Sequence, residues 1–210
     1  MIVSFVLAKL GGNERALERF SLRPEVLMAH LCGKTVALIG NAKSLSLGQF
    51  GPFIDLADIV IRLNAAPMPS AVSHGTKTDW IALSSPIPTE ILQSRNPTHF
   101  LWMTRKRKRL PYALTVRPGF YLNRRSDALA LRAQLNAPPT TGLMMIDLLA
   151  RSPAAKITLY GFDFFTSLSL SGSRTAVQVP HDFAAERAFV DALLARDPRF
   201  SLRIPSAISE

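Results

Sequence analysis

The stretch from Val36 to Trp80 constrains the fold more than any other part of the chain. Four apolar residues beginning at Val36 run directly into Gly40 and Asn41, as a buried parallel strand does when it ends at a binding loop. A second apolar run leads in the same way into Asn64. The carboxyl ends of parallel strands meet at one edge of a sheet, and open α/β sheets bind ligands at that edge. We therefore expect the two asparagines to lie together at a ligand-binding edge.

Strand-like and helix-like segments alternate along the rest of the chain. Short apolar runs typical of strands lie at 79–83, 99–103 and 156–160, and runs typical of helices lie at 126–136, 143–151 and 182–196. This alternation favours an α/β fold, a Rossmann-like α/β/α sandwich around a mainly parallel sheet. The 210 residues suffice for one well-buried core, so we expect residues 1–210 to form a single domain.

The charge balance indicates an anionic partner. The chain has 25 Lys and Arg residues against 15 Asp and Glu residues, a net charge of +10. A phosphate-bearing substrate, a nucleic acid or an anionic membrane surface would each suit this excess. Cys32 is the only cysteine in the sequence. It excludes an internal disulfide and a cysteine-rich zinc site, and it favours a reducing, cytoplasmic compartment.

Two segments bear on contact with a membrane or a nucleic acid. Residues 1–10 are mostly apolar but fall short of the ~20 that span a bilayer. We expect a strand or packing segment there, with shallow membrane contact as the alternative. Arg105–Arg109 is a run of five cations, which favours either a solvated turn or contact with an anionic acceptor or a membrane surface, peripheral to the inner membrane. No aromatic residues are interleaved with the run, so we expect no specific nucleic-acid recognition.

Thr140, Thr141 and Gly142 stand directly before a helical run. The first N–H groups of a helix can bind an anion, and threonine hydroxyls add further donors. The alternative is ordinary capping of the helix by a threonine. Taken with the strand ends described above, the segment favours a site for the phosphate of a nucleotide.

His181 stands at the start of the last helical run, and a histidine readily accepts a proton near neutral pH. The alternative is a polar surface residue beside the helix cap. The sequence lacks the GxGxxG, GxSxG and HExxH motifs. Residues 74–78 resemble the end of a P-loop, but the upstream glycine is absent. It also lacks the Asp-x-Asp pair with which many sugar transferases hold a metal. We therefore expect no metal and no cofactor.

Three motifs, in order, resemble those of the sialyltransferases of glycosyltransferase family 29. They lie within 36–78 (VALIGN to GTKT), 139–162 (PTTGL to LYGF) and 181–186 (HDFAAE). The resemblance makes residues 36–80 one half of a nucleotide site, and residues 138–190 the other half with the catalytic histidine.

The resemblance implies a GT-A-like variant of the fold and a metal-independent, inverting transfer of a keto-sugar from a CMP donor to a glycan hydroxyl. His181 would be the general base, with Glu186 as the second catalytic residue of its motif. The residues implied in donor binding are Gly40, Asn41, Asn64, Thr140, Thr141, Gly142 and Gly161.

The chain also departs from the family. The family has a histidine upstream of His181 that assists phosphate departure, and this chain has none between Phe162 and His181. Lys43 or Arg174 would supply the positive charge instead. The family's linking cysteines and membrane anchor are absent, which indicates a soluble bacterial relative acting on a surface or lipid-linked glycan. Its donor would be CMP-sialic acid or CMP-Kdo. The alternative from another class is a catalytically silent nucleotide- or anion-binding module.

Overall fold

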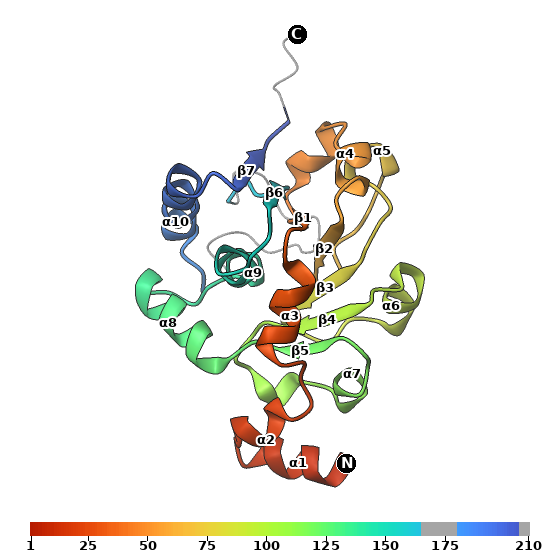
Figure 1. Ribbon diagram of the computed structural model, residues 1–210, viewed down its shortest axis with the longest axis vertical. Coiled ribbons are helices and arrows are strands. Elements are labelled where there is room, and N and C mark those ends of the chain that lie inside the picture. Colours follow the sequence, from red (N-terminus) through yellow and green to blue (C-terminus); the bar gives the residue numbers. More distant parts are fainter. Residues whose placement is uncertain (165–179, 206–210) are drawn as a thin grey trace.

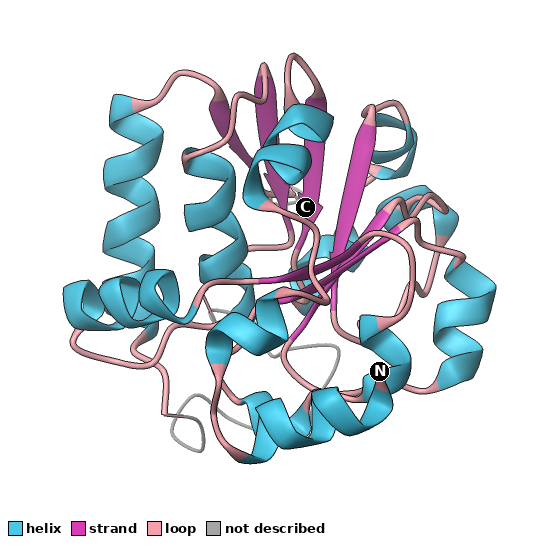
Figure 2. Ribbon diagram, turned by 60° about the horizontal axis from the view of Figure 1, so that its bottom comes forward, coloured by secondary structure: helices cyan, strands magenta, loops and turns pink. Residues whose placement is uncertain are grey.

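The computed structural model describes residues 1–164 and 180–205, which form a seven-stranded sheet with helices on both faces (Figures 1 and 2). The strands are β1 Thr35–Ile39, β2 Ile59–Leu63, β3 Trp80–Leu83, β4 His99–Trp102, β5 Phe120–Leu122, β6 Lys156–Tyr160 and β7 Phe200–Arg203. Every neighbouring pair is parallel. The predicted α/β sandwich around a parallel sheet is confirmed.

The strand order reverses beside β1. The order across the sheet is β5-β4-β3-β2-β1-β6-β7, so the first five strands step away from β1 in one direction. The chain then returns through α8 (Arg125–Leu135) and α9 (Thr141–Ala150) and places β6 on the other side of β1. The loops that leave β1 and β6 therefore diverge, and such a switch point is where doubly wound sheets bind ligands.

One face of the sheet packs against α3 (Pro24–Leu31), α8, α9 and α10 (Phe183–Arg196). Val36 and Leu38 of β1 contribute to this cluster, together with Leu27 and Leu31 of α3. In α9, eight of the ten residues are buried, so this helix is the centre of the layer. Its position fixes the site described below, because its first turn lies beside the strand ends.

The opposite face carries two smaller clusters. η1 (Lys43–Leu47) and α4 (Gly51–Asp55) cover apolar residues of β1 and β2. α1 (Ile2–Leu10), α2 (Glu14–Glu18), α6 (Thr89–Arg95) and α7 (Tyr112–Thr115) cover β3, β4 and β5. Two further short segments are α5 (Ala71–His74) and η2 (Arg107–Arg109).

The amino-terminal segment packs as predicted, but as the helix α1 and not as a strand. Phe5 and Ala8 are three residues apart, so they share one side of the helix, and both are buried. The ring of Phe5 lies 5.6 Å from that of Phe20 and 5.4 Å from that of Tyr112, measured between centroids. This aromatic cluster outweighs the strand preference of the β-branched residues in the segment. Within the described part of the chain, no helix is both long and apolar enough to cross a membrane.

The run of five cations divides into one buried and four exposed residues. Arg107 is only 6% exposed. Its guanidinium donates to both carboxylate oxygens of Glu14, to the Thr104 carbonyl at 2.8 Å and to the Asn123 carbonyl at 2.7 Å. The exposed members are Arg105, Lys106, Lys108 and Arg109. The interpretation as a solvated turn therefore fails for Arg107, which joins η2 to α2 and to the end of β5.

We expect Arg107→Ala to lower the free energy of unfolding by about 3 kcal/mol, because it leaves buried carbonyl groups without a donor and Glu14 without its ion pair. Arg109→Ala, in the same short helix but exposed, is the matched control and should cost less than ~0.5 kcal/mol. Urea unfolding of the three proteins measures the difference. Equal stability of the two variants would contradict an anchoring role for Arg107.

Candidate active site

The candidate site lies where β1 and β6 end, at the switch point of the sheet. Ile39 pairs with Tyr160 at the last position of the two strands. Beyond them, the Gly40 N–H donates to the Tyr160 carbonyl at 2.7 Å and the Ala42 N–H donates to the Gly161 carbonyl at 3.2 Å. The two loops therefore stay hydrogen-bonded to each other just beyond the strands before they separate, and this fixes the backbone at the base of the candidate site.

Two of the predicted glycines, Gly40 and Gly142, border one aromatic ring that the sequence did not single out as a site residue, and a third, Gly161, packs against Gly40. A Cβ atom on Gly40 would lie 2.2 Å from the Gly161 carbonyl oxygen, so the two backbones touch. Gly161 has φ +68°, a left-handed conformation that favours glycine. A Cβ atom on Gly142 would lie 2.8 Å from the ring of Phe162, which also borders Gly40. The loops after β1 and β6 and the start of α9 are therefore packed together through Phe162.

The two predicted asparagines lie at the same edge, on neighbouring strands. Ile39 pairs with Arg62 in the register of β1 and β2, and continuing that register by two residues brings Asn41 level with Asn64. Asn64 has φ 49°, and its Oδ1 accepts from the Ser84 N–H at 2.9 Å. Because that oxygen is occupied, its NH₂ group is the part that would donate to a ligand.

The start of α9 uses Thr140 as its cap, so the capping interpretation holds for this residue. Its Oγ1 accepts from the Leu143 N–H at 3.1 Å. The backbone N–H and the hydroxyl of Thr140 both donate to Glu186, at 2.6 and 2.8 Å. Thr140 is thus occupied within the protein. The N–H groups of Thr141 and Gly142 belong to the first helical turn, which has no carbonyl partners of its own, and they are the ones suited to an anion.

Glu186 lies behind this turn and holds it in place. The side chain is only 4% exposed. Burial raises its pKa to about 7, although the two hydrogen bonds from Thr140 act in the opposite direction. The sequence predicted a catalytic Glu186, and the contact that the structure gives it is with Thr140 in the phosphate-site segment. This contact is that of a positioning residue.

A backbone contact orients His181. Its Nδ1 lies 2.6 Å from the carbonyl oxygen of Pro138. A carbonyl oxygen only accepts, so Nδ1 carries a proton and donates it, which leaves Nε2 as the nitrogen available to accept a proton. Asp182 caps α10 by accepting from the Ala185 N–H at 2.9 Å. The start of α10 thus brings His181 and Glu186 to the same segment, 138–140.

Of the two cations predicted near the phosphate, Lys43 lies within the described residues and Arg174 does not. Lys43 is exposed and begins η1, two residues after Asn41. The neighbouring Ser44 hydroxyl donates to Asp163 at 2.9 Å, which ties η1 to the loop after β6. Arg174 lies outside the described residues. Among residues 1–164 and 180–205, no three His, Cys, Asp or Glu side chains are grouped so that they could hold a metal ion.

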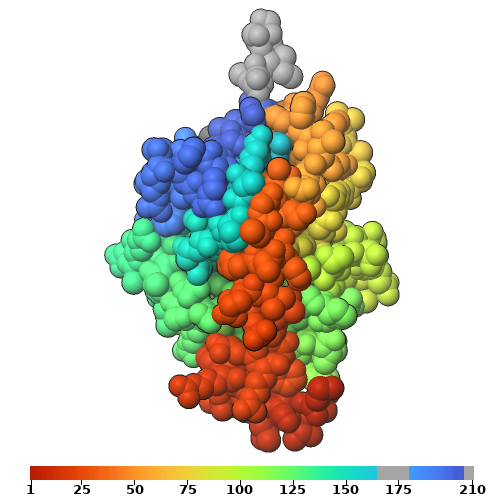
Figure 3. Space-filling model, viewed as in Figure 1, coloured from red at the N-terminus to blue at the C-terminus, as the bar shows by residue number. Residues whose placement is uncertain are grey.

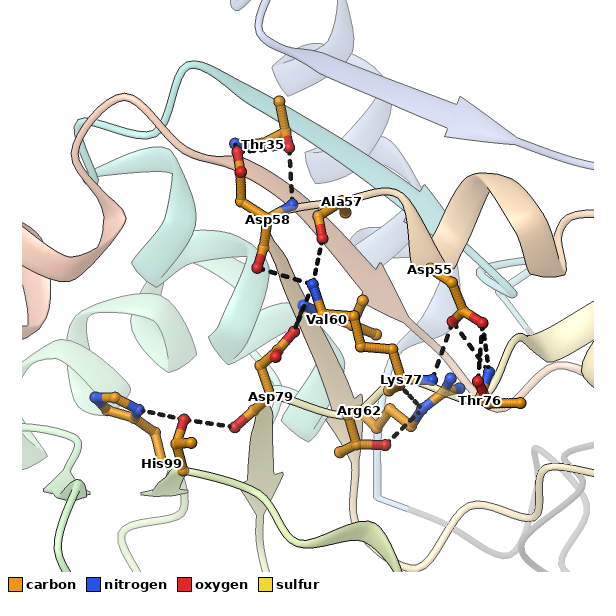
Figure 4. Close-up of polar contacts among 12 residues, drawn as sticks. Thr35, Asp55, Ala57, Asp58, Val60, Arg62, Thr76, Lys77, Asp79 and His99 are labelled. Carbon is orange, nitrogen blue, oxygen red and sulfur yellow. Dashed lines mark hydrogen bonds and ion pairs between the residues drawn. The ribbon is translucent and has the colours of Figure 1, made fainter.

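The stretch that resembles a P-loop has its amide groups occupied inside the protein. Asp55 accepts from the Thr76 and Lys77 N–H groups at about 3 Å, as Figure 4 shows. Partial burial raises the pKa of Asp55, but these hydrogen bonds outweigh it and hold the pKa below its usual value. The buried Arg62 donates to the His74 carbonyl at 2.8 Å and to the Lys77 carbonyl at 2.9 Å. The segment therefore stabilises the half of the site formed by residues 36–80, and its amide groups do not form a phosphate site.

The pH dependence of stability tests the position of Glu186. An unfolded Glu has a pKa near 4.3 and the folded one about 7, so the folded state binds the proton more tightly. Its contribution to stability is full at low pH and is lost as pH rises through 7, on the order of 3 kcal/mol in all. In Glu186→Gln this loss between pH 5 and 8 should disappear, whereas exposed Glu90→Gln should keep it. Urea unfolding across that range measures both, and parallel curves for all three proteins would refute the assignment.

Comparison with known proteins identifies a matching family model and solved structures of similar fold. Residues 20–109 match the model of glycosyltransferase family 29 (sialyltransferase). The crystal structure of a mammalian sialyltransferase has a TM-score of 0.72 at 16% identity, over 93% of this chain and 79% of its own. The sialyltransferase CstII from Campylobacter jejuni, in complex with cytidine-5'-monophosphate, has a TM-score of 0.58 at 15% identity, over 84% of this chain and 82% of its own. No curated protein matches the chain in sequence.

Over residues 20–109, this match confirms the predicted resemblance to the family. The family match covers Gly40, Asn41 and Asn64 and ends before Thr140 and His181. The solved folds extend the similarity over most of the chain, and at these identities they support the fold alone.

Proposed function

We propose that this protein is a glycosyltransferase of the sialyltransferase type that moves a sialic acid or Kdo-like keto-sugar from a CMP donor to a glycan hydroxyl. The observation that carries the proposal is the meeting of two half-sites at one switch point. One half presents Asn41 and Asn64 from the ends of β1 and β2, and the other presents the first turn of α9. His181 is held beside that turn with Nε2 as its acceptor.

The donor class is supported by the chemistry of the edge and by what related folds bind. Amide side chains suit a pyrimidine nucleotide, and backbone N–H groups at the start of α9 suit its single phosphate. Solved structures of similar fold include the sialyltransferase CstII in complex with CMP or with CMP-3FNeuAc, and a mammalian sialyltransferase in complex with Gal-beta-1-3GalNAc-ortho-nitrophenol. We extend the same ligand classes, a CMP-sugar and a glycan acceptor, to this chain.

The proposed reaction is a single displacement. Nε2 of His181 takes the proton of the acceptor hydroxyl, whose oxygen forms a bond to the anomeric carbon from the face opposite the phosphate. The bond between that carbon and the phosphate oxygen breaks, and CMP leaves with the electron pair, so the anomeric configuration inverts. The N–H groups of Thr141 and Gly142 stabilise the departing phosphate.

In this proposal, a side-chain cation near the phosphate supplies the positive charge that a metal ion supplies in many sugar transferases. The sequence has no Asp-x-Asp pair, and a monophosphate leaving group needs less positive charge than a diphosphate. Lys43 follows the β1 edge and is exposed, so its ammonium group is free to turn toward a bound nucleotide. Arg174 is the second candidate. The alternative function, a catalytically silent nucleotide-binding module, keeps the binding surface without the base.

A thermal-shift screen of the metal-free protein tests the donor class. CMP should raise the melting temperature, whereas UMP, AMP, UDP and GDP should raise it less, because only CMP matches the proposed donor. A ligand at 100 times its Kd stabilises a protein by about 2.7 kcal/mol, which is readily measured. The absence of a CMP shift would remove the nucleotide proposal for both candidate functions.

The His181→Ala variant distinguishes the two candidate functions, the enzyme and the catalytically silent module. Loss of a general base should slow transfer about 10²- to 10⁴-fold and leave CMP affinity within about twofold. His30→Ala, an exposed histidine in α3, is the control and should transfer at the wild-type rate. Absence of transfer in the wild-type protein, with CMP binding intact, would favour the silent module.

The leaving-group cation is tested by Lys43→Ala and Arg174→Ala. Loss of the cation that assists departure should lower kcat at least tenfold with a smaller effect on donor affinity. Steady-state kinetics with a CMP-sugar donor measures both constants. Full turnover in both variants would remove the proposal that either residue supplies the charge.

A further inference from the structure

The helix α1 carries an apolar face that the fold leaves uncovered. Its buried residues, Phe5 and Ala8, lie on one side. Its exposed apolar residues recur at the spacing of the other side: Ile2, Val3, Val6, Leu7 and Leu10. Leu7 is 65% exposed and Leu10 is 80% exposed. The helix thus packs with one apolar face and presents a second one to its surroundings.

The four exposed cations of the 105–109 run lie next to this helix. The Lys9 ammonium donates to the Leu110 carbonyl at 2.8 Å, which joins the end of α1 to the residue after η2. Arg107 joins η2 to Glu14 at the start of α2. α1, α2 and η2 therefore form one rigid unit, which makes up one end of the molecule, at the bottom of Figures 1 and 3.

We propose that the exposed face of α1 and the four exposed cations beside it form a docking surface for an anionic phospholipid bilayer. The helix has nine residues, about 14 Å, so it would lie in the interface between headgroups and acyl chains with its apolar face inward. The cations would meet the lipid phosphates. Charge complementarity selects the lipid surface over a second copy of this chain, because each copy would bring the same positive charge to a shared interface.

The docking surface is at the same edge of the sheet as the candidate site. Arg105 follows the carboxyl end of β4 by three residues, and β4 is three strand spacings from β1, about 14 Å. Docking through α1 would hold that edge next to the bilayer. If the proposed transfer is correct, the acceptor is then a glycan carried on a lipid; the docking itself does not depend on the transfer.

Sedimentation with lipid vesicles tests the surface on the full chain. We expect binding to vesicles of equal phosphatidylglycerol and phosphatidylcholine, and at least tenfold weaker binding to phosphatidylcholine alone. Leu7→Ser/Leu10→Ser should weaken binding at least tenfold, because two aliphatic side chains no longer enter the lipid. The control is Phe53→Ser/Leu56→Ser, in α4 and directly after it, at the opposite end of the molecule in Figure 1; the two residues have the same exposures, 65% and 80%. It should bind as the wild type does.

The cations are tested by a second pair of double variants with equal net charge. Lys106→Gln/Arg109→Gln should weaken binding roughly 25-fold, about fivefold for each cation. Lys34→Gln/Arg196→Gln removes two exposed cations before β1 and at the end of α10, at the opposite edge of the sheet, and should have little effect.

Three results would overturn the proposal. One is equal binding by the α1 variant and the α4 control, which would leave only general electrostatic adsorption. Another is the absence of binding to anionic vesicles. The third is a concentration-dependent mass in light scattering that the Leu7→Ser/Leu10→Ser variant loses, without vesicle binding, which would make the face an interface between copies. Melting temperatures confirm that each variant is folded, and a normal CMP shift in a variant that no longer sediments separates this proposal from the proposed function.

Discussion

The backbone contact between Gly40 and Gly161 is the constraint on which the candidate site depends. Two hydrogen bonds continue the pairing of β1 and β6 beyond the strands, and a side chain at Gly40 would collide with the Gly161 carbonyl. The loops separate immediately afterwards because the strand order reverses there. Because the sheet itself joins these residues, the backbone at the base of the candidate site is preorganised.

The second half of the site is held by a different kind of interaction. α9 is almost wholly buried, so its first turn cannot move without the core, and Glu186 fixes the approach to that turn through both donors of Thr140. The same helix that supplies Glu186 begins beside His181, which is tied to the Pro138 carbonyl. Segments 138–140 and 181–186 are thus one structural unit, although about 40 residues separate them in the sequence. The spacing of His181 and Glu186 has a physical reason, because it lets the start of α10 contact the segment 138–140 at two points.

The sequence predicts those parts of the fold whose signal is local. β1, β2 and the two asparagines follow from apolar runs that end at small and amide residues, and α9 follows from a long apolar run after a threonine cap. β7 escapes prediction because only Phe200 and Leu202 alternate in it, and its strand conformation depends on pairing with β6. The division of the cationic run also escapes prediction. Nothing local distinguishes Arg107 from its neighbours, and its burial depends on Glu14, about 90 residues away.

The ion pair between Arg107 and Glu14 links the stability of the amino-terminal end to its surface properties. Arg107 is satisfied by one carboxylate and two carbonyl groups, so its charge is neutralised inside the protein, and the remaining four cations are held facing outward. α1 is attached to the same unit through Phe5 on one side and Lys9 at its end. An apolar helix face fixed beside a cluster of positive charge differs from a loose cationic tail, since its orientation relative to the sheet is set by the fold. The amino-terminal end of the molecule is therefore rigidly coupled to the sheet edge on which the candidate site lies.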